Sequence, residues 1–209
     1  MIMIPYVKIK RVMDLLFSII LLIPASPIMF CAAVAIRLGS QGPVLFKQER
    51  PGKDGVIFTI YKFRTMRLET EKDGQPLSDM ERMTRIGTVL RKLSVDELPQ
   101  LFNILKGDMS FIGPRPLLVQ YLERYTPRQM RRHDVKPGIS GWAQINGRNG
   151  VDWETRFEYD VWYVEHISFR TDFSIFFRTL ATVLARRGVN QSKNETMEEF
   201  GVSAKRLKD

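Results

Sequence analysis

A long apolar stretch near the N-terminus contrasts with the mixed polarity of the rest of the chain. The 22 residues from Leu15 to Ile36 carry no charge, whereas Arg11, Asp14 and Arg37 stand close to its two ends. About 20 apolar residues are enough for a helix to cross a bilayer, so a single transmembrane helix is the simplest prediction. A secretory signal fits less well, because the apolar run is too long for one.

Two prolines in the middle of this stretch favour a different path. Pro24 and Pro27 each remove a backbone donor, and Ser26 can donate a hydrogen bond to a carbonyl freed at the break. Each half would be about 15 Å long, half of a hydrocarbon core of about 30 Å. Positive residues mark the cytoplasmic side, and here they flank both ends: Lys8, Lys10, Arg11, Arg37, Lys47, Arg50 and Lys53. The residues favour a re-entrant helix-break-helix over a span and leave both open.

The pattern after the apolar stretch predicts strands and then helices. β-rich runs at 44–48 and 56–63, separated by turn residues, predict a hairpin with a longer loop. Residues 67–78 are polar and predict a loop. Residues 79–92 have helical periodicity, with an apolar stripe formed by Met83, Ile86, Leu90 and Leu93.

A second helix is predicted from 95 to 105, ending at Lys106-Gly107, with its apolar face formed by Leu98, Leu101, Phe102 and Leu105. Ser94 and Glu97 have the spacing of a capping box. Pro99 conflicts with this start, because proline is tolerated only very early in a helix. Two alternatives stay open: the helix begins later, near Asp96, or it is bent at Pro99.

The remaining chain predicts a functional loop and an amphipathic helix. Residues 134–150 are rich in turn residues, and an irregular loop of that length is often functional. An aromatic cluster follows at 153–163. Residues 173–187 have the pattern of a basic amphipathic helix, for which core packing and a place in the lipid headgroup layer are equally supported. The polar residues from 188 predict a loosely held tail.

Together these elements predict an α+β fold: a re-entrant membrane helix, a small β-hairpin and several helices, some amphipathic and interfacial. The predicted division is a membrane-associated segment at 1–39, a catalytic domain at 40–187 and a tail at 188–209.

The composition limits the classes of binding partner but does not identify a single one. The formal net charge of +9 favours an anionic partner, and nucleic acid, anionic lipid and a phosphorylated substrate all fit that description. Cys31 is the single cysteine, so a disulfide framework is excluded and a reducing compartment is expected. His133 and His166 belong to no spaced ligand set, which argues against zinc.

Adjacent carboxylates at Asp96 and Glu97 are the strongest chemical signal. Acidic residues in a first helical turn are common, because they complement the helix dipole. The nearby Arg91 and the Arg115 of a Pro-Arg-Pro turn suit phosphate, which guanidinium groups bind in a bidentate way. An aspartate there can coordinate Mg²⁺ or attack phosphorus itself. Further cations that can complete an anion site are Lys62, Arg64 and Arg67, although a solvated surface cation is the simpler interpretation of each.

Several long motifs stand in order along residues 8–187. They are Lys10-Arg-Val-Met-Asp14, the Ser26-Pro27 break, Phe46-Lys-Gln-Glu-Arg-Pro-Gly52, Tyr61-Lys-Phe-Arg-Thr-Met66, Leu93-Ser-Val-Asp-Glu-Leu-Pro-Gln-Leu-Phe-Asn-Ile-Leu-Lys-Gly-Asp-Met-Ser-Phe-Ile-Gly-Pro-Arg-Pro116 and Lys136-Pro-Gly-Ile-Ser-Gly-Trp-Ala-Gln-Ile-Asn-Gly-Arg148. Together they resemble the bacterial sugar transferase family, the monotopic polyprenyl-phosphate phosphoglycosyl transferases. The chain looks like a short member, most similar to enzymes that begin N-linked glycan assembly with a diacetylated bacillosamine phosphate.

The resemblance implies a re-entrant helix broken at Ser26-Pro27 and a catalytic domain on the cytoplasmic face of the bacterial inner membrane. It implies that Asp96 attacks the β-phosphate of a UDP-sugar, expels UMP and passes the sugar phosphate to undecaprenyl phosphate. Glu97 would activate the lipid phosphate or hold Mg²⁺. The implied phosphate-binding residues are Arg91, Arg115 and, more weakly, Lys62.

Two rivals stay open. One is a non-enzymatic basic module that binds anionic lipid or nucleic acid, although no nucleic-acid motif supports it. The other is a single-step enzyme in which Asp96 serves only a metal. The sequence indicates neither the sugar nor the oligomeric state.

Overall fold

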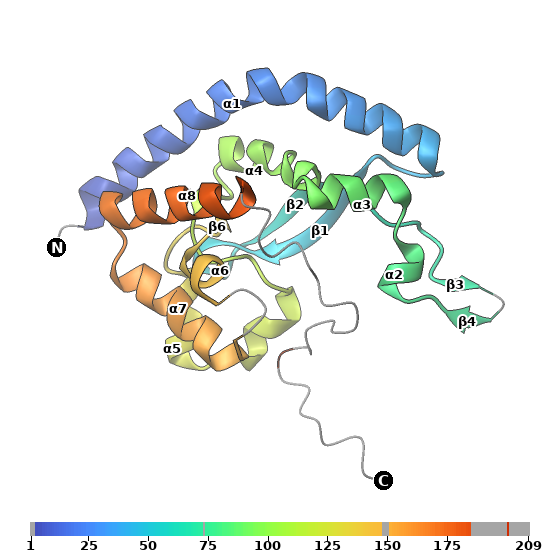
Figure 1. The fold of residues 1–209 in the computed structure, drawn as a ribbon. Helices are drawn as coiled ribbons and strands as arrows, with labels where there is room; N and C mark the ends of the chain where they lie inside the picture. The colour runs from blue at the N-terminus through green and yellow to red at the C-terminus, as the bar shows by residue number, and fades with distance from the viewer. Residues whose placement is uncertain (1–2, 73, 148–150, 185–199, 201–209) are drawn as a thin grey trace, which may run out of the picture. The chain divides into compact units, whose positions relative to one another are not determined.

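The computed structural model describes residues 3–72, 74–147, 151–184 and 200. The chain forms two compact units, each built from separate segments. The α1 unit comprises Lys8–Glu49 and Phe58–Met109, and the α7 unit comprises Met1–Val7, Arg50–Ile57 and Ser110–Asp209. Helices and small two-stranded sheets make up both, as the predicted α+β class requires (Figure 1). The predicted domain limits at 39 and 187 stay predictions, and all of the predicted tail except residue 200 lies outside the described residues.

The N-terminal apolar stretch forms one long helix, α1 (Met3–Gly39). Within the described residues it is the one helix that is long and apolar enough to cross a membrane. Much of its apolar surface is exposed: Phe30 is 70% exposed and Leu38 is 83% exposed. Buried residues recur on a single face at helical spacing, at Asp14, Ser18, Ala25, Ala32 and Ile36. One face therefore packs against the protein, and the others present an apolar surface suited to lipid.

The predicted break into two helices is wrong, because α1 continues through Pro24 and Pro27. Pro27 has no N–H to give to the Ile23 carbonyl four residues earlier. The Ser26 hydroxyl donates to that carbonyl instead, at 2.9 Å, which confirms the compensation expected of this serine. The helix bends along its length in Figure 1 without ending.

The predicted hairpin is confirmed as β1 (Leu45–Pro51) and β2 (Ile57–Phe63), which pair in one sheet. The connection, which includes the 3₁₀ turn Lys53–Gly55, is too short for any but antiparallel strands. The loop predicted at 67–78 contains a second, minute antiparallel pair, β3 (Glu71–Lys72) and β4 (Gln75–Pro76). Residues 67–78 show no alternation of apolar and polar positions, so their sequence did not indicate this pair of strands.

The helix predicted at 79–92 is divided into α2 (Asp79–Arg82) and α3 (Arg85–Lys92). The division follows from Thr84, whose side chain caps α3 by accepting from the Gly87 N–H at 2.8 Å. The predicted apolar stripe is correct in Leu90, which is buried, and wrong in Leu93, which is 58% exposed. The core of the α1 unit joins this stripe to α1 and β2 through Ala32, Ile36, Phe63, Ile86 and Leu90.

The helix predicted at 95–105 begins later than either alternative placed it. α4 spans Gln100–Lys106 with Pro99 at its N-cap, and a separate 3₁₀ turn, η2 (Val95–Glu97), precedes it. The capping box is wrong, because Ser94 is left-handed at φ 55° and its side chain makes no capping bond. The predicted end at Gly107 is confirmed by its left-handed φ of 97°. Its apolar face is only partly correct, since Phe102 is exposed and Ile104 is buried.

The α7 unit has a parallel pair of strands, β5 (Ser110–Ile112) and β6 (Gly138–Ser140), and helices packed on it. Its core contains Ile112, Tyr163, Ile167 and Ile175. The stretch predicted as an irregular loop at 134–150 holds β6 and α6, so that prediction is wrong for both. The remaining elements are the 3₁₀ turn Val119–Arg124, α5 (Pro127–Met130), the 3₁₀ turn η4 (Arg131–His133), α6 (Trp142–Asn146), α7 (Trp153–Glu165) and α8 (Phe169–Leu184).

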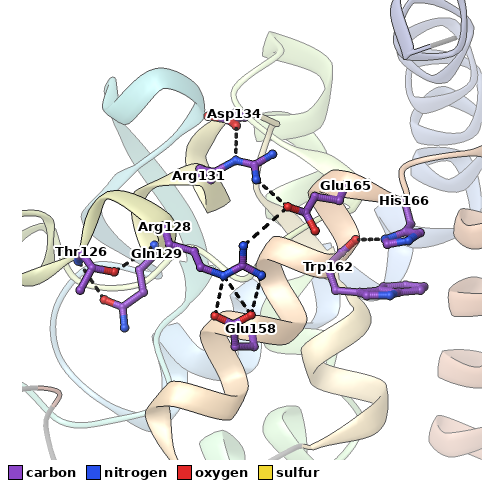
Figure 2. Close-up of polar contacts among 9 residues, drawn as sticks. All are labelled: Thr126, Arg128, Gln129, Arg131, Asp134, Glu158, Trp162, Glu165 and His166. Carbon is purple, nitrogen blue, oxygen red and sulfur yellow. Dashed lines mark hydrogen bonds and ion pairs between the residues drawn. The ribbon is translucent and has the colours of Figure 1, made fainter. Parts of the chain in front are cut away.

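Surface ion pairs tie α5 and η4 to α7. Figure 2 shows Arg128 holding Glu158 through two nitrogens, with Nε–Oε1 2.9 Å and Nη2–Oε2 2.8 Å. Arg131 Nη1 lies 2.5 Å from Glu165 Oε1 in the same view. These groups are substantially exposed to solvent, which screens their charges, so each pair contributes little to stability.

Beneath this surface lies a buried ion pair. Arg132 donates from Nε and Nη2 to Asp160 Oδ2 at 3.0 and 2.7 Å, and both side chains are nearly inaccessible to solvent. The neighbouring His133 is also buried, and its Nδ1 lies 3.0 Å from the Gly52 carbonyl. Burial, and then the charge of Arg132, lower the pKa of His133 to about 4, so its ring is neutral at pH 7.

The predicted amphipathic helix at 173–187 corresponds to α8, which starts earlier, at Phe169. Its interior residue Ile175 is fully buried, whereas an apolar face remains about half exposed: Phe169, Phe173, Phe176, Phe177 and Leu180. Core packing therefore accounts for one face of α8 and does not account for the other.

Candidate active site

The acid pair lies in η2, between α3 and α4. α3 ends at Lys92, and Ser94 reverses the chain with a positive φ of 55°, which is uncommon for a residue other than glycine. The 3₁₀ turn then sets Asp96 inward and leaves Glu97 nearer the surface, at 22% side-chain exposure. Backbone strain of this kind is found at functional sites, where it fixes the direction of a reactive side chain.

Asp96 is a buried carboxyl among charges, with 8% of its surface exposed. Burial is the main cause that raises its pKa above the ordinary value for aspartate, and the adjacent Glu97 raises it further. The charges of Lys62 and Arg91 and its own backbone N–H act in the opposite direction. The result is a carboxyl that is more basic than usual and has cations near it that favour its charged form, which suits a nucleophile.

Glu97 forms an ion pair with Lys62 of β2, with Lys62 Nζ 2.6 Å from Glu97 Oε1. Both side chains keep about a fifth of their surface accessible. Lys62 therefore lies at the acid pair as predicted, and in this structure its ammonium binds a carboxylate. An anion entering the site would meet a lysine that is already oriented.

Arg91 lies in the last turn of α3 and points to the same place. Its Nε donates to the Thr65 hydroxyl at 3.0 Å, which fixes the plane of the guanidinium group. Sequence reasoning missed Thr65, although it belongs to the Tyr61–Met66 motif. A hydroxyl carries no charge signal, so the pattern of charges could not reveal it.

Asn103 is a second residue that the sequence did not reveal. It is fully buried in α4 and holds two points of β2, accepting from the Tyr61 N–H at 3.0 Å and donating to the Thr59 carbonyl at 2.7 Å. The Asn103 side chain therefore links β2, which carries Lys62, to α4, which follows Glu97. Its place among apolar neighbours in the predicted helix is the one signal that could have drawn notice.

Arg115 lies in the α7 unit, so the structure brings together four of the five predicted polar site residues: Lys62, Arg91, Asp96 and Glu97. The Arg115 side chain is exposed, and its carbonyl accepts from Arg132 Nη2 at 2.7 Å. After burial, its charge is the next cause that lowers the pKa of Arg50. Burial is the largest cause that lowers the pKa of Arg156. The charge of Arg115 lowers this pKa further, whereas the charge of Asp160 raises it. The α7 unit thus contains a cluster of guanidinium groups, those of Arg50, Arg115 and Arg156, which lie far apart in the sequence.

The suggestion that Arg64 completes an anion site is wrong. Its guanidinium is buried and donates to the carbonyls of Ser40 and Gln41, just after α1. Arg67 is exposed, as expected of a solvated cation.

The donor set fits Mg²⁺ only in company with a substrate. Among the described residues no group of three or more His, Cys, Asp or Glu side chains gathers closely enough to hold a metal ion. Asp96 and Glu97 supply two carboxylates, and Mg²⁺ is commonly bound by one or two carboxylates together with substrate phosphate oxygens. The pair therefore suits a metal that arrives with, or is completed by, a phosphorylated ligand.

Comparison with known proteins gives these residues a context. The uncharacterized sugar transferase EpsL of Bacillus subtilis (strain 168) is 52% identical over 191 residues, which cover 91% of this chain and 95% of that protein. The UDP-N-acetylgalactosamine-undecaprenyl-phosphate N-acetylgalactosaminephosphotransferase of Aeromonas hydrophila is 46% identical over 88% of this chain. The undecaprenyl-phosphate galactose phosphotransferase of Salmonella typhimurium is 41% identical over 86% of it.

The chain spans almost the whole Bacillus relative but only 45% of the Aeromonas protein and 41% of the Salmonella protein. A family model described as bacterial sugar transferase matches residues 5–186, nearly the range over which the motifs were recognised. These similarities decide against the non-enzymatic alternative, because the matching proteins are named as transferases. The chain belongs to the bacterial sugar transferase family.

Proposed function

We propose that this enzyme transfers a sugar 1-phosphate from a UDP-sugar to undecaprenyl phosphate and releases UMP, through a covalent intermediate on Asp96. The observation that carries the proposal is the buried Asp96 carboxyl next to Glu97, on which the charges of Lys62 and Arg91 act. The names of the Aeromonas and Salmonella relatives, both undecaprenyl-phosphate phosphotransferases, support the donor and acceptor classes.

In the first step an Asp96 carboxylate oxygen attacks the β-phosphorus of the UDP-sugar. A bond forms between this oxygen and phosphorus, and the bond from phosphorus to the bridging oxygen breaks, so UMP leaves with that oxygen and its electron pair. Arg91, which Thr65 orients, and Lys62 lie where they can bind the phosphate oxygens of the donor. Arg115 is the proposed phosphate ligand from the α7 unit.

In the second step an oxygen of undecaprenyl phosphate attacks the same phosphorus. The bond to Asp96 breaks, the carboxylate is restored, and the product is a polyprenyl diphosphosugar. Dividing the transfer in this way lets one site serve a soluble donor and a lipid acceptor in turn. Glu97 serves the acceptor either as the base that takes its remaining proton or as a metal ligand. If Mg²⁺ is bound, it would neutralise charge on the phosphate oxygens beside Asp96.

The membrane part of the proposal rests on α1 and α8. Cations flank both ends of α1, and its exposed apolar side chains suit lipid. We propose that α1 enters and leaves the inner membrane by the cytoplasmic face, bending at Pro24, Ser26 and Pro27. The exposed phenylalanines of α8 would lie in the headgroup layer, and the net charge of +9 favours anionic lipid there.

The sugar is proposed to be an N-acetylated amino sugar such as diacetylbacillosamine, in the first membrane step of glycoconjugate assembly. A panel of UDP-sugars that includes the N-acetylgalactosamine and galactose donors of the two named relatives tests this. UMP release fastest with a sugar lacking an acetamido group would overturn the choice of substrate and leave the reaction itself intact.

The reaction is tested by incubating the enzyme with a UDP-sugar labelled in the sugar, without acceptor. We expect UMP release of about one equivalent, label retained on the protein, and a loss of about 10³-fold or more in Asp96→Asn. Asp54→Asn is the matched control, because Asp54 is exposed with φ 57° and asparagine tolerates that conformation. Full turnover by Asp96→Asn, or transfer to the lipid with no trapped adduct in the wild-type enzyme, would refute the covalent route in favour of direct transfer.

A further inference from the structure

Arg11, in the N-terminal third of α1, caps the C-terminus of α4. Its Nη1 donates to the Ile104 carbonyl at 2.5 Å and its Nη2 donates to the Leu105 carbonyl at 2.8 Å. The last four carbonyls of a helix have no donor within the helix, and a cation there also complements the helix dipole. The side chain thus binds two carbonyls at the end of α4, of which that of Ile104 also accepts from the Gly107 N–H, and joins that helix to α1.

Arg64 makes the corresponding contact at the other end of α1. It is only 5% exposed, and it donates from Nη2 to the Ser40 carbonyl at 3.0 Å and from Nη1 to the Gln41 carbonyl. These carbonyls follow directly on Gly39, where α1 ends. A buried guanidinium that donates to two carbonyls at this point is stabilised by the negative end of this long helix.

Both contacts lead directly to the acid pair. α4 follows Glu97 after Leu98 and Pro99, so Arg11 holds the helix that continues from the pair. β2 carries Lys62, the partner of Glu97, two residues before Arg64. Thr65, which orients Arg91, comes next. Asn103 closes the arrangement by binding β2 to α4.

We propose that Arg11 and Arg64 are positioning residues that fix the acid pair relative to both ends of α1. If α1 lies in the membrane, as the proposed function holds, the two arginines set the depth of Asp96 relative to the membrane surface. That depth decides whether the acceptor phosphate, anchored by its lipid chain, can reach phosphorus on Asp96. A soluble donor approaches from water and is not restricted in this way.

The inference therefore predicts that the two half-reactions separate. In Arg11→Met and Arg64→Met, UMP release without acceptor should stay within about twofold of wild type, whereas transfer to undecaprenyl phosphate in vesicles should fall about tenfold or more. Transfer to a short-chain, water-soluble polyprenyl phosphate should stay near the wild-type rate, because that acceptor is not held at a fixed depth.

Two sets of variants make the test specific. Arg85→Met is the matched control, an exposed arginine at the start of α3, and should leave all three rates unchanged. Arg11→Lys and Arg64→Lys keep the charge at the helix end and one donor, so they should recover part of the vesicle reaction. They also serve where a methionine variant does not fold.

The outcomes distinguish this inference from the proposed function. If UMP release and both transfers fall together in the folded variants, the arginines are merely structural and the inference is overturned. It is also overturned if the vesicle reaction is unaffected. If the wild-type enzyme releases no UMP and retains no label, the proposed covalent function fails first, irrespective of the variants.

Discussion

The ammonium group of Lys62 lies 2.6 Å from Glu97 Oε1, directly beside the buried carboxyl of Asp96. This ion pair joins the end of β2 to the turn before α4. Lys62 and Glu97 act on the pKa of Asp96 in opposite directions, the glutamate raising it and the lysine lowering it. The pair thus adjusts the ionisation of a neighbour that burial alone would drive towards the neutral form.

Replacing either partner should shift the acidic limb of the pH profile. In the proposed mechanism, UMP release without acceptor requires ionised Asp96, so its rate should fall as the pH falls through the pKa of that residue. Lys62→Met removes a cause that lowers this pKa, and the limb should move to higher pH. Glu97→Gln removes a cause that raises it, and the limb should move to lower pH. Shifts in the same direction for both variants would contradict this account.

Restoring two backbone donors in α1 should change its membrane path. In Pro24→Ala combined with Pro27→Ala, the carbonyls of residues 20 and 23 regain their helical partners and the helix straightens. The N-terminus is then expected on the periplasmic side. The check is labelling of Lys8→Cys by an impermeant maleimide, in a Cys31→Ser background that removes the single native cysteine.

Lys53→Cys, in the connection between β1 and β2, is the control for the cytoplasmic side. In a chain with both prolines, Lys8→Cys and Lys53→Cys should be labelled from that same side. Labelling from opposite sides in that chain would show that α1 spans the membrane.

Replacing one partner of the buried ion pair between Arg132 and Asp160 should destabilise the folded protein. Arg132→Met leaves an uncompensated carboxylate in the interior, which is expected to lower the free energy of unfolding by about 3–5 kcal/mol. Adding Asp160→Leu should recover most of the loss. Chemical denaturation in detergent provides the measurement, with Arg128→Met as an exposed control whose effect should be much smaller. A double variant no more stable than Arg132→Met would argue against this explanation.

His133 should make stability depend on pH in a defined window. Its pKa is about 4 in the folded protein and near 6.5 when unfolded, so the unfolded chain binds more protons between these values. The free energy of unfolding should therefore decrease as the pH falls from about 6.5 to about 4, by at most about 3 kcal/mol. His133→Gln should flatten this part of the curve. An unchanged curve in His133→Gln would assign the dependence to other groups.

The sequence was most informative where periodicity or a rigid residue type left few alternatives. The apolar stretch, the hairpin around Lys53–Gly55 and the glycine end of α4 at Gly107 were all predicted from such signals. The pair Asp96–Glu97 was recognisable because two carboxylates adjoined arginines in a long motif. Lys62 and Arg91 were placed at the same site by charge alone, and the structure brings them there.

The errors have a common cause, which is that local rules were overridden by contacts between distant segments. Ser94 and Glu97 have capping-box spacing, yet the chain needs a left-handed reversal at Ser94 to turn Asp96 inward. Arg64 resembled a surface cation, and only the fold shows that it lies at the end of α1. Thr65 and Asn103 act through neutral hydrogen bonds, which no pattern of charge or hydrophobicity reports.

The face of α1 that carries Ala32 and Ile36 sits against Phe63 and Leu90, so this helix supplies part of the interior of the unit that holds the acid pair. Deleting the first 39 residues to obtain a soluble fragment would expose that interior and remove the guanidinium group that closes the end of α4. Any preparation of a competent enzyme should therefore retain the helix and an amphiphile to cover it.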